Sequence, residues 1–301
     1  MRRRPIRGAL VVLLAVVLAL AAGCEHRAQD APAADAPAAR LVATDGFGAT
    51  VLLDRRVAPD QSAMRALRGA TDVRTTYAGA FVQEMLGRDG DAGARRDWLL
   101  YVDGIGSSVG AKDVDVEDGM AMWWDFRPWS SVSRTTSVVG LWPRPFAGDD
   151  ARERRVSADA PLDAPLRAAG ARLVDDPSAP WRVRVGDDAD LQRRDPAWRA
   201  ARRDPEAAGL TITIDRGAVV ALDPVRTRWE PVPAARALVA AVPTGIQPED
   251  GMLLVAAGLD AGAARAAAER VARDPGVLAL RYAVAFDGAG VPLRAGGRSG
   301  A

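Results

Sequence analysis

Residues 98–129 concentrate the side chains best suited to binding a flat ligand. Six aromatic residues fall in this stretch: Trp98, Tyr101, Trp123, Trp124, Phe126 and Trp129. Successive side chains of an extended strand point to opposite faces, so Trp123 and Arg127 share one face and Trp124 lies on the other. Because Asp125 and Arg127 are costly to bury unpaired, we expect the Trp123 face to be exposed and the Trp124 face to be core. An exposed Trp beside an Arg could stack on a flat ligand. The alternative is that most of these rings pack against a helix or a second domain.

Catalytic and metal-binding side chains are scarce. The single cysteine and the single histidine, Cys24 and His26, both precede the folded part. Triads that pair Ser or Cys with His, and His-based zinc or haem sites, are therefore excluded. Residues 113–119 resemble a calcium loop, but the EF-hand order requires Gly and Glu where Asp118 and Trp124 stand. We expect no catalytic residue, no metal and no bound cofactor. Paired carboxylates such as Asp187-Asp188 could act as an acid and a base, so a hydrolase remains an alternative.

The elements that must position the aromatic residues follow from local patterns. Residues 98–102 and 120–126 read as strands, and Asp118-Gly119 as the turn before the second. Upstream, residues 41–44 and 50–53 predict a hairpin. A short helix should carry Met64 and Leu67 on one face, and residues 77–83 should add a strand.

These motifs resemble a known family. The matching runs are Tyr77-Ala78-Gly79-Ala80-Phe81-Val82-Gln83, Asp97-Trp98-Leu99-Leu100-Tyr101-Val102-Asp103-Gly104, Gly110-Ala111, Asp118-Gly119 and Trp123-Trp124-Asp125. Together they resemble the transcobalamin-like C-terminal domain over about residues 40–129. The resemblance implies a β-grasp-like domain, a mixed sheet with one helix across it. It also implies cobalamin as a possible ligand, and bacterial members that are secreted proteins or lipoproteins. The candidate ligand-binding residues are Tyr77, Phe81, Gln83, Tyr101, Trp123, Arg127 and Trp129.

The N-terminus predicts export and lipidation. A basic segment precedes an apolar run over residues 9–20, which is shorter than a membrane-spanning helix. Ala21-Ala22-Gly23-Cys24 then resembles a bacterial lipobox, in which the Cys thiol receives a diacylglyceryl group. Acyl chains on Cys24 would hold the protein on a membrane. Residues 1–23 are thus a predicted signal peptide, and residues 24–40, rich in Ala, Pro and Asp, a flexible tether.

Two folded units are expected after the tether. Residues 41–146 form the β-grasp-like unit, in which residues 138–141 could add an edge strand. Residues 156–295 alternate short apolar runs with Ala-rich runs, which indicates an α/β unit of no recognised family. Within it, Asp260 is the expected N-cap of a helix over residues 261–273. The fold class is therefore predicted to be α+β, a β-grasp-like domain followed by an α/β domain.

Charge and composition limit the function. The formal net charge of the 301 residues is +1, which gives no electrostatic case for nucleic acid. We expect a lipoprotein exported across the cytoplasmic membrane and anchored on its outer side. Its function would be non-catalytic binding of a corrinoid or similar flat ligand, with a transporter as a possible partner. The alternative is a structural or adhesive surface module that binds protein or glycan.

Overall fold

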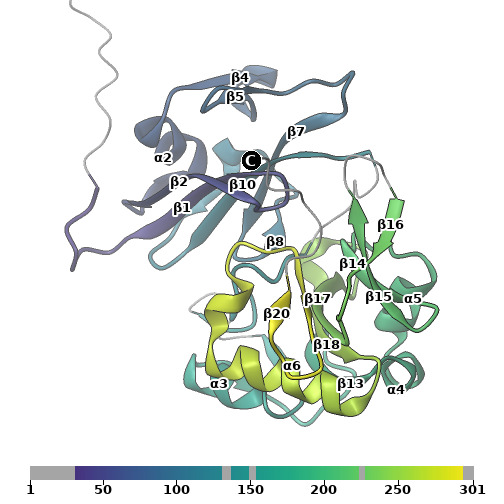
Figure 1. Ribbon diagram of the computed structural model, residues 1–301. Helices are drawn as coiled ribbons and strands as arrows, with labels where there is room; N and C mark the ends of the chain where they lie inside the picture. The colour runs from purple at the N-terminus through teal and green to yellow at the C-terminus, as the bar shows by residue number, and fades with distance from the viewer. Residues whose placement is uncertain (1–30, 131–136, 149–153, 224–227, 294–301) are drawn as a thin grey trace, which may run out of the picture.

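The computed structural model describes residues 31–130, 137–148, 154–223 and 228–293 (Figure 1). In this part of the chain, no helix is long and apolar enough to cross a membrane. The fold is α+β, as predicted, and it is built on two main sheets.

The first sheet has five strands and carries the aromatic stretch. Its order is β2 (Thr50–Val57), β1 (Ala39–Asp45), β10 (Ala121–Pro128), β7 (Arg96–Val102) and β8 (Ile105–Gly106). Strand β1 runs parallel to β10, and the other neighbours are antiparallel, so the sheet is mixed. The predicted hairpin and both aromatic strands are confirmed.

One helix covers one face of this sheet. Helix α2 (Ala63–Ala70) begins after Ser62, whose hydroxyl accepts the N–H of Arg65. Met64 and Leu67 are buried against the sheet residues Trp124 and Phe126. The helix therefore packs where the Met and Trp side chains of β10 predict a core.

Short elements connect these parts. They are β3 (Gln61–Ser62) paired with β9 (Asp115–Val116), the sheet of β4 (Val73–Thr76), β5 (Phe81–Met85) and β6 (Arg88–Asp89), and the 3-10 turns η1 (Tyr77–Gly79) and η2 (Ala111–Asp113). Residues 138–141 form turns and not the predicted edge strand. Val138 and Val139 are nevertheless fully buried, which explains the apolar run.

The second sheet has seven strands. Its order is β12 (Arg172–Leu173), β11 (Arg155–Ala158), β13 (Trp181–Asp187), β18 (Met252–Gly258), β17 (Ala237–Pro243), β19 (Ala283–Phe286) and β20 (Pro292–Leu293). The first four strands are parallel, and the rest pair antiparallel.

Both faces of the second sheet are covered. Helices α3 (Asp163–Ala168) and α6 (Ala261–Arg273) share one core cluster. The other face packs against α4 (Asp188–Arg194), α5 (Pro196–Arg203) and the small sheet of β14 (Ile212–Asp215), β15 (Ala218–Asp223) and β16 (Arg228–Pro231). Two further 3-10 turns are η3 (Pro248–Asp250) and η4 (Pro275–Leu278). Asp260 accepts the N–H of Ala263 at 2.9 Å, so the predicted N-cap of α6 is confirmed.

The ordered contacts of the N-terminal segment begin at an earlier residue than predicted. Strand β1 already includes Ala39 and Arg40, which the sequence assigns to the tether. The Arg56 guanidinium donates to the carbonyls of Ala34 and Ala36 at 2.7 and 2.8 Å. Ala39 and Arg40 therefore pair with β2, the turn over residues 34–36 is held by Arg56, and both belong to the folded body. Cys24, with the predicted signal peptide, lies outside the described residues.

Candidate functional site

The predicted stacking face of β10 is buried. Trp123 and Arg127 are both 0 % exposed, so the prediction that this face is open is wrong. Trp124, at 2 % exposed, is core as expected. Asp125 and Arg127 can be buried because each has hydrogen-bond partners on other elements. The local sequence pattern of β10 does not indicate those partners.

Asp125 is surrounded by donors. Its carboxylate accepts the Thr44 hydroxyl at 2.5 Å and the N–H groups of Phe47 and Gly48 at 2.9 and 3.2 Å. The Tyr282 hydroxyl adds a fourth bond at 3.0 Å. Burial raises the pKa of Asp125, although the bonds from Thr44 and Gly48 oppose that rise.

Arg127 is held by two tyrosines. Its Nε donates to the Tyr282 hydroxyl at 3.1 Å, and its Nη2 donates to the Tyr101 hydroxyl at 3.2 Å. The guanidinium carbon also lies 5.2 Å from the centre of the Phe47 ring. Trp123 completes the cluster by donating its indole N–H to the Thr44 hydroxyl at 2.7 Å. The cluster lies between the first sheet and the segment that carries Leu280 and Tyr282, so we interpret it as structural.

A short C-terminal segment covers this face. Leu280 and Tyr282 pack on Val42 and Trp123 in one buried cluster. The Leu280 N–H donates to the Gly140 carbonyl at 3.0 Å. A Cβ on Gly48 would lie 1.9 Å from the Leu280 carbonyl oxygen, so only glycine permits this approach. Tyr282 was missed by sequence reasoning, because nothing near it in the chain indicates a partner on β10.

Two other predicted residues are exposed together. Tyr77 is 81 % exposed and Phe81 is 57 % exposed. Their rings meet edge to face with centroids 5.7 Å apart. They lie on η1 and β5, beside the first sheet. Among the predicted ligand-binding residues, this pair, and not Trp123 and Arg127, is strongly exposed.

Phe81 borders a groove of about 290 Å³. Its walls come from β5 with the residue before it, β7, the stretch from the end of β8 to the start of η2, and one residue of β10. The lining residues are Ala80, Phe81, Val82, Trp98, Leu99, Leu100, Tyr101, Gly106, Ser107, Val109, Gly110, Ala111 and Trp124. Val109 on the rim is 51 % exposed. Most of the lining side chains are apolar or aromatic, which suits binding of an apolar group.

The remaining predicted residues have structural partners. Gln83 donates its amide N–H groups to Asp89 and to the Gly90 carbonyl, both at 2.8 Å. Trp129 has its backbone N–H bonded to the Arg95 carbonyl at 2.8 Å, and the Arg95 guanidinium lies over its ring. The structure thus brings Tyr77 and Phe81 together at the groove, and Tyr101, Trp123 and Arg127 together in the buried cluster.

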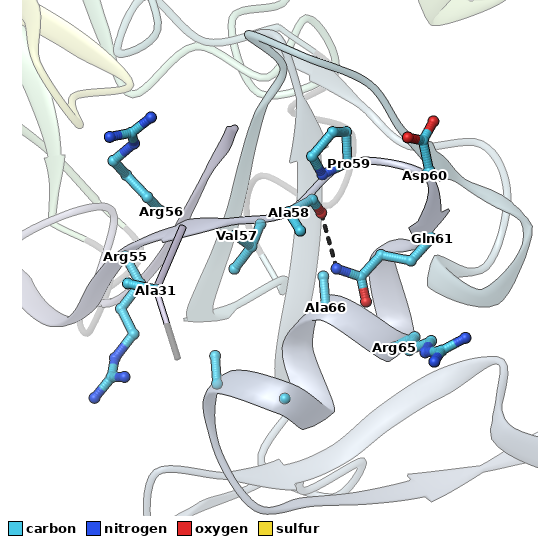
Figure 2. Close-up of a pocket in the computed structure, with 12 residues that line it drawn as sticks. Ala31, Arg55, Arg56, Val57, Ala58, Pro59, Asp60, Gln61, Arg65 and Ala66 are labelled. Atoms are coloured by element: carbon cyan, nitrogen blue, oxygen red, sulfur yellow. Dashed lines mark hydrogen bonds between the residues drawn. The ribbon is translucent and has the colours of Figure 1, made fainter. Parts of the chain in front are cut away.

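A larger hollow of about 440 Å³ lies between the end of β2 and α2 (Figure 2). Arg55, Arg56 and Arg65 line it, but Figure 2 shows their guanidinium groups pointing in different directions. Arg56 is already bonded to the N-terminal segment. Since the charges do not converge, we do not regard this hollow as a binding site. Within the described ranges, no group of three or more His, Cys, Asp or Glu side chains could hold a metal ion.

Comparison with known proteins adds little beyond the first sheet. Residues 60–127 match the family model described as "Domain of unknown function (DUF4430)". No curated protein matches the chain. Among solved structures, a protein of Ruminococcus gnavus ATCC 29149 that has been proposed to bind metal is 14% identical, with a TM-score of 0.27. The match covers 31% of this chain and 98% of that protein. At this TM-score the likeness supports no statement about fold or ligand.

Proposed function

We propose that this chain is a lipoprotein anchored through Cys24 on the outer side of the cytoplasmic membrane, where it binds a ligand without catalysis. The observation that carries the binding role is the groove beside β7, with Phe81 on its rim and Tyr77 against Phe81. Large exposed apolar side chains around a concave site are typical of interaction surfaces. The apolar lining supports binding and offers no pair of acid and base.

The ligand class has two candidates. The resemblance to the transcobalamin-like C-terminal domain supports a corrinoid or another flat ligand, passed on to a transporter. The mixed sheet with α2 across it is the arrangement which that resemblance implies. Because Trp123 and Arg127 are covered, such a ligand would stack on Tyr77 and Phe81. The second candidate is a protein or glycan, which the 81 % exposure of Tyr77 favours.

Titration tests the binding role. Cobalamin, cobinamide and a panel of oligosaccharides are titrated against the mature chain carrying Cys24→Ser, with tryptophan fluorescence as readout. Trp98 and Trp124 line the groove and should report its occupation. Phe81→Ala should weaken binding of a stacked ligand by about 1–3 kcal/mol, on the scale of base–aromatic stacking. Val51→Ala is the control, since Val51 is 52 % exposed on the distant strand β2.

Mass spectrometry tests the anchor. The native mature N-terminus should be a diacylated Cys24, and Cys24→Ser should release the protein from membranes. An unmodified Cys24, or an intact Met1, would exclude lipidation without affecting the binding role.

A further inference from the structure

We propose that the groove binds an extended peptide, which adds as a strand to the open edge of β7. This assignment of ligand class rests on the proposed binding function of the same groove. The observation behind it is the pattern of backbone hydrogen-bonding groups along the groove wall, which is separate from the exposure of Tyr77 and Phe81.

Strand β7 is only partly covered on its outer edge. It pairs with β10 along its whole length, from Arg96 to Val102. On the other side, β8 pairs only with Tyr101 and Val102, and Asp91 bonds to Arg96. Residues 98–100, between these contacts, form a gap in the ladder, and they line the groove.

Two backbone groups in this gap have no hydrogen-bond partner among the described residues. Trp98 N–H bonds to the carboxylate of Asp97 at 2.8 Å, and the Leu100 carbonyl accepts Ser107 N–H at 2.9 Å. Neither the Leu100 N–H nor the Trp98 carbonyl bonds to any residue that the structure describes. Alternation along the strand directs both toward the groove, on the same side as the bonded groups of Arg96 and Leu100.

This pair of groups matches the ladder of a β-strand. Because Ser107 already lies opposite Leu100, the chain that fits is one that runs parallel to β7. A single residue of that chain, placed opposite Leu99, can donate its N–H to the Trp98 carbonyl and accept the Leu100 N–H. Unpaired strand edges are templates for another chain, and peptide binding by strand addition uses such main-chain bonds for affinity. A corrinoid or a sugar would not require this spacing.

The rim supplies apolar contacts for the peptide side chains. Six large apolar side chains are strongly exposed in the described ranges, and Tyr77, Phe81 and Val109 lie together here. The Ser108 hydroxyl bonds to Glu249 at 2.5 Å, which joins the rim to the loop that carries Ile246, 95 % exposed. An extended peptide with alternating apolar residues would cover these side chains.

Amide hydrogen exchange of the free mature chain, with Cys24→Ser, is the first test. The Leu100 amide should exchange much faster than the Leu99 amide, which points toward β10. Equal protection of the two amides would show that the edge is closed and would overturn the proposal.

Peptide selection is the second test, with a library of random twelve-residue peptides displayed on phage as probe. Selected peptides should protect the Leu100 amide. They should bind Leu100→Pro at least about fivefold more weakly, since proline removes the donor but is tolerated at a strand edge. Leu100→Val keeps the N–H and should bind within about twofold of the parent.

If Leu100→Pro does not fold, the proposal is tested by one measurement, which is whether bound peptide protects the Leu100 amide of the parent chain from hydrogen exchange. Failure to select peptides, or selected peptides that leave this amide unprotected, overturns the peptide assignment. If cobalamin or an oligosaccharide then binds through Phe81, the proposed binding function stands without it. If no probe binds, both fail.

Discussion

The Tyr282 hydroxyl lies 3.1 Å from Arg127 Nε and 3.0 Å from Asp125 Oδ2, so it accepts from one charged group of β10 and donates to the other. Tyr282 is 5 % exposed, and both partners are 0 % exposed. One hydroxyl from the C-terminal half thus helps to compensate two buried charges of the first sheet. The burial of Asp125 and Arg127 therefore depends on the packing of the C-terminal half against the first sheet.

Replacing Tyr282 by Phe should destabilise the protein by about 1–3 kcal/mol, because the ring stays but two buried polar groups lose a partner. Tyr77→Phe is the matched control, since Tyr77 is 81 % exposed, and it should change the unfolding free energy by less than about 0.5 kcal/mol. Urea unfolding followed by circular dichroism measures both. Equal stability of the two variants would contradict a role for the Tyr282 hydroxyl.

Gly48→Ala should destabilise the protein more than Gly46→Ala. Both glycines have positive φ, at 75° and 71°, so alanine strains the backbone at both positions. Only at Gly48 would the Cβ overlap the Leu280 carbonyl, at 1.9 Å; at Gly46 the nearest atom is 3.8 Å away. We expect an additional cost of about 1–3 kcal/mol at Gly48, the range for overpacking, in denaturant melts. A similar loss of unfolding free energy at the two sites would mean that the segment around Leu280 can move away from the new Cβ without cost.

Trp123→Ala and Trp124→Ala should both destabilise the protein, each by about 3–5 kcal/mol, as large buried truncations do. Trp123 packs with Tyr282 at a centroid distance of 5.3 Å, and Trp124 packs under α2. Phe81→Ala, at an exposed position, should cost little stability. A small effect of Trp123→Ala in denaturant melts would argue that the face opens in solution.

The second unit contains a buried ion pair with a predictable pH response. Asp195 receives two hydrogen bonds from Arg182, at 2.6 and 3.0 Å, and both residues are buried. Burial alone would raise the pKa of Asp195. The hydrogen bonds and charge of Arg182, together with the backbone N–H groups of Trp198 and Ala197, outweigh that effect and hold the pKa below its usual range. The ionised carboxylate therefore stabilises the fold above the unfolded pKa, about 3.9, and this stability is lost as the pH falls through the folded value.

Asp195→Asn should accordingly cost about 3–5 kcal/mol at pH 7, because it leaves the Arg182 charge without a counter-ion. The cost should shrink as the pH falls below about 4, because Asp195 of the unfolded parent is then protonated and must lose its proton on folding. Urea melts of both chains at pH 7 and pH 3 measure this difference. Asp215→Asn, at the exposed end of β14, is the control. A cost that does not change with pH would show that the pair contributes nothing through charge.

Local signals predicted most elements of the first sheet. The turn at Asp118-Gly119, the alternation in β10 and the apolar positions Met64 and Leu67 each express a contact made nearby in the sequence. The same applies to Asp260, whose role as N-cap depends only on residues that follow it.

The site was harder to predict, because its partners lie far apart. Asp125 and Tyr282 are separated by 157 positions, and no local pattern reports that separation. The sequence argument that charged side chains avoid burial holds only when they have no partner. Independent folding of residues 41–146 remains a prediction, and such a fragment would lack Leu280 and Tyr282.

The bonds of Arg56 limit the distance between the folded body and the proposed anchor at Cys24. Nine residues lie between Cys24 and Ala34, the first residue that Arg56 holds. The two are ten residue steps apart, a reach of at most about 33–36 Å. The fastening is on β2, one edge of the sheet, whereas the groove lies along β7, three strand spacings or about 14 Å away. For a chain anchored at Cys24, as we propose, the tether would therefore leave the body at the β2 edge of the sheet and not beside the groove.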